Sequence, residues 1–213
     1  MSKNKKTRAR SAEAKEKQFQ RIIKAGRELF LKHGPEGVSM RKLAQKLDMG
    51  QASLYTYISS KRELWFAILR NDFGKFELGM AKIMQDHKGN YKELLEKIAQ
   101  FYLEFAKEDE KRYKMMFQTQ APQAERTGLL EQQYNSKSIY YLNEIVQKAV
   151  DAGEIKEKDV GKLSFFIWGI VHGTVSVIQT EFFGDQEQIP EYGNIDEYHQ
   201  FALKYIRKML SEM

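Results

Sequence analysis

Residues 38–58 read VSMRKLAQKLDMGQASLYTYI, and this stretch decides the fold because it holds two short helical patterns separated by a tight turn. Ser39 precedes the first pattern and can cap it, because its hydroxyl accepts from the free backbone N–H groups of a first helical turn. Apolar residues then follow at helical spacing on one face, namely Met40, Leu43, Ala44 and Leu47. This face is predicted to be buried.

The turn between the two patterns contains Asp48 and Gly50, and both residue types tolerate left-handed backbone. Beyond it, Leu54 and Ile58 lie one helical step apart and are expected to pack back, with Met49, on the first helix. The remaining residues of the second pattern are small, hydroxyl-bearing or amide-bearing and are predicted to face outward: Gln51, Ala52, Ser53, Tyr55, Thr56 and Tyr57. Two helices joined in this way predict a helix-turn-helix.

In helix-turn-helix proteins the second helix enters the major groove of DNA, where its first residues meet base edges. Gln51 and Ser53 are the predicted base-reading residues, and Tyr55, Tyr57 and Lys61 suit contacts with phosphate oxygens. The whole set of candidate DNA-contacting residues is Ser39, Met40, Arg41, Gln51, Ala52, Ser53, Tyr55, Thr56, Tyr57 and Lys61. Ser60 and Glu63 form a capping-box pattern, which predicts that the next helix begins directly after Ser60.

The distribution of charge supports this interpretation. Residues 1–70 contain 17 Lys and Arg against 6 Asp and Glu, a net charge of +11, whereas residues 71–213 contain 18 against 23, a net charge of −5. A basic field confined to one end attracts a polyanion there. Spacing alone is equally compatible with a plain helical hairpin in an all-α bundle, and the charge favours DNA binding.

The run from residue 19 to residue 69 contains AGRELFLKHGPEGVSMRKLAQKLDMGQASLYTYISSKRELWFAIL and resembles the DNA-binding domain of the tetracycline-repressor (TetR/AcrR) family of bacterial transcription regulators. The chain has the family's Leu-Tyr-x-Tyr at the end of the recognition helix and a Ser-Lys that opens the fourth helix. It departs from the family pattern at Asp48, where Gly is common, at Gly50, where a capping Ser or Thr is common, and at Ile58, where Phe is common. Gly in place of a side-chain cap costs only a few tenths of a kcal/mol, so the recognition helix is expected to form with a softer start.

The length of 213 residues and the hydrophobic content of 42% allow a sizeable core in one or two domains. The absence of Cys excludes disulfides, thiolate nucleophiles and Cys-based metal sites, and suits a reducing cytoplasm. The four histidines, His33, His87, His172 and His199, have no metal-binding spacing, so we predict neither a metal nor a cofactor. No Ser-His-Asp, paired-carboxylate or phosphate-loop arrangement stands out, and an enzyme is not predicted.

Three parts are predicted along the chain. Residues 1–14 form a basic, disordered arm, residues 15–62 the DNA-binding domain with its helix-turn-helix at about 38–57, and residues 63–213 the ligand-binding and dimerisation domain. The N-terminus lacks the apolar stretch of a signal peptide. It is either a solvated tail or an arm that reaches the phosphates or minor groove beside the site through Lys3, Lys5, Lys6, Arg8 and Arg10.

No strand pattern competes with helices, so the fold class is all-α: a three-helix DNA-binding domain followed by a helical bundle. Helices are predicted at about 14–33, 60–85, 91–108, 110–118, 125–151, 157–183 and 196–211. Their breaks are predicted at Gly34-Pro35, Lys88-Gly89-Asn90, Ala121-Pro122, Gly153 and the loop 184–193.

Residues 163–180 carry no charge and therefore need weighing against a membrane span. We reject the span, because the stretch contains polar residues and lacks flanking belts, and a helix that meets both its own core and a partner subunit is equally apolar. Trp168-Gly169 and His172-Gly173 resemble a C-terminal domain found in a branch of the family named for its Trp, His and Gly residues. That resemblance implies a homodimer in which this helix and the last helix form a four-helix interface.

Aromatic and thioether residues gather in the middle of the chain, where Tyr and Met suit adaptable cavities with polar tips. They are either ordinary core or the lining of a pocket for a small apolar or amphipathic effector. The candidate ligand-binding residues are Phe101, Tyr102, Phe105, Tyr113, Met116, Phe117, Tyr134, Tyr141, Trp168 and His172. The predicted function is a cytoplasmic repressor, released from a palindromic double-stranded operator by that effector. The alternative is a DNA-binding protein without a small-molecule effector, either architectural or controlled by a partner.

Overall fold

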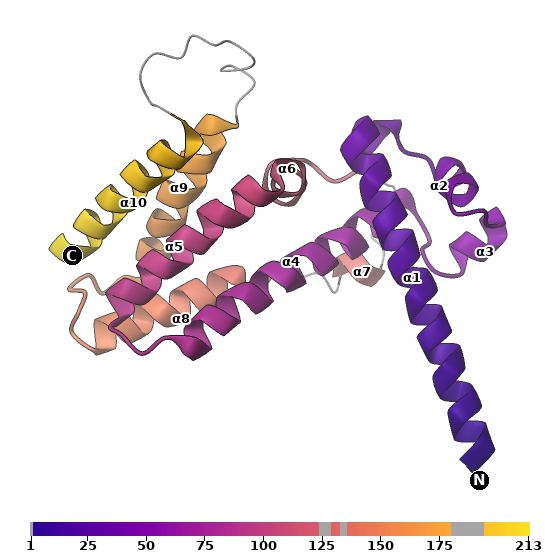
Figure 1. Ribbon diagram of the computed structural model, residues 1–213, viewed down its shortest axis with the longest axis horizontal. Coiled ribbons are helices and arrows are strands. Elements are labelled where there is room, and N and C mark those ends of the chain that lie inside the picture. The colour runs from indigo at the N-terminus through magenta and orange to yellow at the C-terminus, as the bar shows by residue number, and fades with distance from the viewer. Residues whose placement is uncertain (1, 124–128, 133–135, 180–193) are drawn as a thin grey trace. The chain divides into compact units, whose positions relative to one another are not determined.

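The computed structural model describes residues 2–123, 129–132, 136–179 and 194–213, and the regular structure in these ranges is helical (Figure 1). The helices are α1 (Ser2–Gly37), α2 (Met40–Lys46), α3 (Gln51–Tyr55), α4 (Lys61–Asp86), α5 (Tyr91–Glu108), α6 (Glu110–Phe117), α7 (Leu129–Gln132), α8 (Ser138–Asp151), α9 (Val160–Ile178) and α10 (Ile195–Glu212). The all-α prediction is confirmed.

The chain forms two compact units. Unit 1 contains residues 1–72 and 114–135, and unit 2 contains residues 73–113 and 136–213. Unit 1 therefore extends further along α4 than the predicted boundary at residue 62, and it includes a second segment that the sequence did not assign to it.

The helix-turn-helix of unit 1 forms through local interactions. The Ser39 hydroxyl accepts from the backbone N–H of Lys42 and caps α2. Asp48 adopts left-handed backbone with φ 52°, as predicted, and the chain turns there. Gly50 differs from the prediction, because its φ of −63° is open to any residue and its glycine character is not needed for the turn. As expected, no side chain caps α3.

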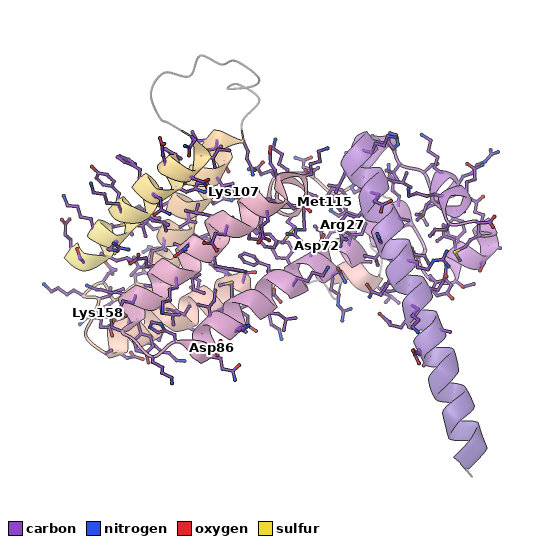
Figure 2. The ribbon with its side chains drawn as sticks, in the orientation of Figure 1. Arg27, Asp72, Asp86, Lys107, Met115 and Lys158 are labelled. Carbon is purple, nitrogen blue, oxygen red and sulfur yellow. The ribbon has the colours of Figure 1, made fainter. Side chains whose placement is uncertain are left out.

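The first turns of α4 belong to the core of unit 1. Phe30 of α1 meets Trp65 of α4 edge to face, with ring centroids 5.0 Å apart. Further along, the Arg27 guanidinium donates to both carboxylate oxygens of Asp72, and the two side chains lie together in Figure 2. Asp72 is only 1% exposed. This buried ion pair explains why unit 1 reaches Asp72.

The start of α4 is also tied to the second segment of unit 1. Arg62 donates to the backbone oxygen of Pro122 at 2.8 Å and to both carboxylate oxygens of Glu131 in α7. The pKa of Arg62 is raised, chiefly by the hydrogen bonds to Glu131. These contacts are non-local and carry no sequence motif.

The N-terminal arm differs from its prediction, because α1 is helical back to Ser2 where residues 1–14 were expected to be disordered. The segment ARSAEAKEK is rich in residues of high helix propensity, which accounts for the helix. At its other end α1 breaks at Gly34, whose φ of 67° is left-handed, directly before Pro35. The predicted stop at Gly34-Pro35 is therefore confirmed.

Unit 2 is a bundle in which α5 packs on α8, α9 and α10, and α9 packs on α8 and α10. Each of these helices buries one apolar stripe, including Leu95 on α5, Ile145 on α8, Val171 on α9 and Ile206 on α10. Within the described residues, α9 alone has the length and apolar composition of a membrane span, a property it shares with core helices.

The single helix predicted over 125–151 is wrong. The described residues contain α7 and α8, and Ser136 and Lys137 before α8 are not helical. Both contact the Glu77 carboxylate of α4, the first through its hydroxyl and the second through its backbone N–H. A distant carboxylate thus stabilises the non-helical backbone, and short hydroxyl side chains favour such local breaks. The predicted loop 184–193 lies outside the described residues.

Candidate functional site

The outward face of α3 is polar and carries no charge. Leu54 is fully buried, whereas Tyr55 is 45% exposed. The other exposed residues of this face are Gln51, Ala52, Ser53 and Thr56. Thr56 donates from its hydroxyl to the backbone oxygen of Ser53, so its hydroxyl is partly committed within the helix. What remains for a partner is a short helix with small side chains, one amide and one phenol.

The residues predicted on α2 divide between surface and core. Ser39 and Arg41 are exposed, and Ser39 is engaged as the cap of α2. Met40 is only 7% exposed because it belongs to the apolar face of α2. The structure therefore corrects the inclusion of Met40 among the DNA-contacting residues.

The two remaining candidates, Tyr57 and Lys61, are half-buried. The Lys61 ammonium lies 3.1 Å from the Glu36 carboxylate, which is 78% exposed. An exposed pair of this kind contributes little free energy, so the ammonium can exchange Glu36 for a phosphate. This competing carboxylate was not predicted from the sequence.

In unit 2, three polar rings from different helices meet. Tyr102 of α5 and Tyr113 of α6 place their hydroxyls 3.0 Å apart, and the Nδ1 of His172 on α9 lies 2.9 and 2.7 Å from them. The Trp168 ring lies over that of His172, with centroids 5.2 Å apart. We call Tyr102, Tyr113, Trp168 and His172 the tyrosine-histidine cluster.

Burial keeps this cluster neutral. It raises the pKa of the Tyr102 hydroxyl far above its ordinary value and raises that of Tyr113 to about 12. Burial also lowers the pKa of His172. Neutral hydroxyls and a neutral imidazole can exchange hydrogen bonds with a carbonyl or hydroxyl of a ligand without a charge penalty.

The other predicted ligand-binding residues are distributed unevenly. Phe101 and Phe105 reach the cluster through Phe76 of α4, whose ring centroid lies 5.2, 4.9 and 5.7 Å from those of Phe101, Phe105 and Tyr102. Phe76 was not predicted as a site residue, although its aromatic character and its helical spacing from Phe73 were visible in the sequence.

Met116 and Phe117 belong to unit 1, so they do not share a compact unit with the tyrosine-histidine cluster. Tyr141 lies half-buried on α8. Tyr134 lies outside the described residues. Within the described ranges, no group of three or more His, Asp or Glu side chains is arranged to hold a metal ion.

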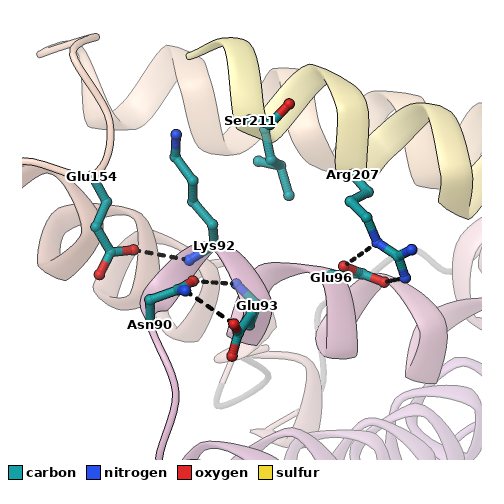
Figure 3. A pocket seen from close by; sticks show the side chains of 8 residues that line it. Asn90, Lys92, Glu93, Glu96, Glu154, Arg207 and Ser211 are labelled. Carbon is teal, nitrogen blue, oxygen red and sulfur yellow. Dashed lines mark hydrogen bonds and ion pairs between the residues drawn. The ribbon is translucent and has the colours of Figure 1, made fainter.

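A polar hollow of about 560 Å³ lies beside α5 and α10 (Figure 3). Arg207 forms an ion pair with Glu96, and the Glu154 carboxylate accepts from the backbone N–H of Lys92. Asn90 caps α5 and also donates to Glu93. One ion pair and local hydrogen bonds thus engage the carboxylates of this hollow, and none of the predicted ligand-binding residues lines it.

The exposed apolar residues of unit 2 are concentrated on its last two helices. Six lie there, namely Phe165, Phe166 and Val177 on α9 and Ile195, Phe201 and Tyr205 on α10, and two more, Leu78 and Tyr140, lie on α4 and α8. On α9, a side chain at Gly169 or Gly173 would meet nothing within 4 Å, so the backbone itself is accessible there. We call these residues of α9 and α10 the apolar face. Six large apolar side chains exposed on two helices that contact each other make this face a candidate interaction site.

Comparison with known proteins identifies two successive segments. Residues 22–68 match the family described as bacterial regulatory proteins, tetR family, and residues 95–192 match the tetracyclin repressor-like C-terminal domain. Between them these segments cover more than half of the chain. An HTH-type transcriptional regulator of Staphylococcus aureus strain USA300 is 31% identical over 86 residues, which is 40% of this chain. The matched segment spans 46% of that curated relative.

Solved structures share the fold at low identity. The transcriptional regulator FadR from Bacillus subtilis, in complex with stearoyl-CoA, has a TM-score of 0.68 and 19% identity over 91% of this chain and 97% of its own. AibR, in complex with isovaleryl coenzyme A and operator DNA, has a TM-score of 0.63 and 20% identity over 88% of this chain and 96% of its own. Together with the two matched segments, the helix-turn-helix shows that the chain belongs to the tetracycline-repressor family.

Proposed function

We propose that this protein is a sequence-specific DNA-binding repressor that leaves a palindromic operator when a small molecule binds unit 2. The observation that carries the proposal is the exposed, uncharged polar face of α3 on a capped helix-turn-helix. Small side chains there permit close approach to base edges, and an amide can read a donor and an acceptor together.

Within that face, Gln51 and Ser53 are proposed to read bases. Tyr55, Tyr57 and Lys61 are proposed to contact phosphates, and the basic residues before position 14 to contact the flanking backbone. Phosphate contacts fix position and add affinity for any sequence, whereas base contacts select one sequence. Substitution of the base-reading residues should therefore alter which DNA sequence is preferred. Substitution of the phosphate-contacting residues should lower the affinity for all sequences.

A homodimer is part of the proposal. One recognition helix reads too few base pairs for selectivity, and two helices related by a two-fold axis, roughly 34 Å apart or a small multiple of it, read both halves of a palindrome. The apolar face of α9 and α10 supports this step, because a second copy would remove its six large side chains from water. The dimer would be cytoplasmic, non-enzymatic and free of the membrane, and its C-terminal domain would be of the Trp-His-Gly type.

The effector is proposed to be an apolar or amphipathic small molecule that uses the tyrosine-histidine cluster as its polar contact. The FadR and AibR structures are complexes with stearoyl-CoA and isovaleryl coenzyme A. The thioester carbonyl of such a molecule accepts hydrogen bonds of the kind that the Tyr102 and Tyr113 hydroxyls can donate. Acyl-coenzyme A is therefore the first class to test. Release of DNA requires that the effector bind the non-DNA-binding conformation more tightly.

The test is a footprint on the DNA beside the protein's own gene, repeated with stearoyl-CoA and with isovaleryl-CoA. We expect protection of an inverted repeat that is lost when an effector is added. A broad footprint without sequence preference would instead favour the alternative, a DNA-binding protein with an architectural role. A sequence-specific footprint that no small molecule removes would favour control by a partner.

Two substitutions on α3 distinguish base recognition from phosphate contact. Gln51→Ala should change which base is preferred at one position of each half-site, by about 1–3 kcal/mol of discrimination. Tyr55→Phe, which removes one hydroxyl from the same face, should weaken binding to all sequences about equally. An unchanged sequence preference for Gln51→Ala would remove that residue from the base-reading role.

A further inference from the structure

A second hollow, of about 440 Å³, lies at the end of α4 and has a different character from the polar hollow of Figure 3. Lys82 and Asp86 of α4 and Lys97 of α5 lie at its edge, and Phe101 contributes an aromatic wall. Asp86 marks the place in Figure 2. Within the described residues, neither Lys82 nor Lys97 forms an ion pair with a carboxylate, so the hollow has a net positive charge.

His87 holds one of these ammonium groups without neutralising it. The Nε2 of His87 lies 2.8 Å from the backbone oxygen of Asn90, and a carbonyl oxygen can only accept. Nε2 is therefore the protonated nitrogen, and Nδ1 accepts from the Lys97 ammonium at 3.2 Å. The ammonium is fixed at the edge of the hollow, keeps its full charge and has two N–H groups left for an anion.

The aromatic wall connects this hollow to the interior of unit 2. Phe101 packs directly on the bare backbone of α4 at Gly79, where an added Cβ would lie 2.4 Å from the ring. The Phe101 ring also stacks on Phe76 at 5.2 Å, and Phe76 contacts Tyr102 of the tyrosine-histidine cluster at 5.7 Å. Two ring contacts thus separate the charged hollow from the buried polar cluster.

We propose that this hollow binds the anionic head of the effector, a phosphate or a carboxylate, through Lys82 and Lys97, while the apolar part of the effector packs on Phe101. The proposal rests on the proposed function and specifies it: the effector is an anionic amphiphile. Lys82 and Lys97 bind the head, and Phe101 contacts the apolar part next to it. Asp86 opposes the head and limits affinity.

The experiment measures binding of stearoyl-CoA, coenzyme A and stearate to the full-length protein by titration calorimetry. We expect Lys82→Gln with Lys97→Gln to weaken binding of the anionic amphiphile about tenfold, because two charge-assisted hydrogen bonds are lost at a partly exposed site. Asp86→Asn should act in the opposite direction and tighten binding about twofold to threefold, by removing a like charge. If stearate shows the loss, the head is a carboxylate; if only the coenzyme A compounds show it, the head is a phosphate.

The matched control is Lys156→Gln with Lys158→Gln, which removes the same charge from exposed positions of unit 2 outside the hollow. It should leave every affinity within about twofold, since neither side chain lines the hollow and exposed charges interact weakly through water. Equal affinity for wild type and the Lys82/Lys97 variant would overturn the inference, and so would a wild type that binds none of the three probes.

Operator binding by wild type is measured in parallel, so that two failures can be told apart. A wild type that binds an operator but none of the anionic probes would reject the charged hollow and leave the DNA-binding function standing with a neutral effector. A wild type that prefers no operator would reject the proposed function itself.

Discussion

The exposed face of α3 carries Gln51, Ser53 and Thr56, whereas the exposed face of α9 and α10 carries Phe165, Phe166 and Phe201. The first offers hydrogen bonds and close approach, and the second offers apolar area and little else. Base edges in DNA bind polar side chains that can approach closely, whereas a protein–protein interface gains stability from buried apolar area. The contrast fits the proposal that unit 1 binds DNA and that unit 2 binds a second copy of the chain.

The interiors of the two units differ as well. Unit 1 buries a charged pair, Arg27 with Asp72, whereas unit 2 buries a neutral cluster of Tyr102, Tyr113 and His172. A buried charge needs its partner, and its loss is costly. Neutral hydroxyls and imidazole can change partners more cheaply. Unit 1 is thus suited to holding one geometry, and unit 2 to accepting a ligand.

The largest expected effect comes from the surface of unit 2. Phe166→Glu with Phe201→Glu should give a monomer whose operator affinity falls roughly 1,000-fold, because half of the specific contacts are lost. The monomer should still fold, since these side chains are already 55% and 56% exposed. Sedimentation measures whether the variant is a monomer, and operator titration measures the loss of affinity. Leu78→Glu, at an α4 residue that is 72% exposed, is the matched control, and a dimeric double variant would contradict the assigned interface.

The next effect concerns the interior of unit 1. Arg27→Leu leaves the Asp72 carboxylate buried without its cation and should lower the free energy of unfolding by about 3 kcal/mol. Urea unfolding measures the loss. Lys148→Leu, which breaks the exposed Lys148–Glu144 pair of unit 2, should cost at most about 0.5 kcal/mol. Similar losses for the two variants would show that the ion pair does not hold α1 to α4.

A smaller effect tests the interior of unit 2. Burial lowers the pKa of His172 and of His199 in the folded protein below the ordinary 6.5. Below that value the unfolded chain binds more protons than the folded one, so stability should fall as the pH drops through the region just under 6.5. Chemical unfolding at pH 7.5 and pH 5.5 measures this.

His172→Gln should make the stability less dependent on pH, with the remaining dependence due to His199 and other groups. His33→Gln, which changes a largely exposed histidine of unit 1, is the control and should leave the slope as it is. A slope that His172→Gln leaves unaltered would indicate that burial of this imidazole does not contribute to the pH dependence.

The smallest effect concerns the uncapped start of α3 on the surface of unit 1. Gly50→Ser restores a side-chain cap to α3 in a position where an added Cβ meets nothing within 4 Å. We expect a gain of a few tenths of a kcal/mol, seen as slower hydrogen exchange in α3. Gly50→Ala adds the same carbon without the hydroxyl and should give no such protection. Equal protection from hydrogen exchange in Gly50→Ala would show that the effect comes from a lower entropy of the unfolded chain and not from a cap.

The features that were predicted correctly depend on neighbours in the chain. The cap at Ser39, the left-handed turn at Asp48 and the stop at Gly34 each follow from the residue type and its position. The bounds of α5 follow from an equally local signal, because Asn90 caps its first turn. Helical spacing likewise placed Leu54 inward and left the polar face of α3 outward.

The features that were missed depend on distant residues. The expected helix over 125–151 is interrupted where Glu77 of α4 accepts from Ser136 and Lys137. Met40 was assigned to the surface although its own apolar spacing placed it in the core. The candidate ligand-binding residues divide between the two units, because composition alone does not show which aromatic residues share a compact unit.

The all-α class, the helix-turn-helix and the polar character of α3 could be predicted from the sequence, because helix spacing, caps and turns arise from interactions within about four residues. The contacts among Tyr102, Tyr113 and His172, the contact of Phe76 with Phe101, and the ion pair of Arg27 with Asp72 became visible in the folded structure alone. Such contacts join residues far apart in the chain, and their geometry is set by the packing of whole helices, which no local pattern records.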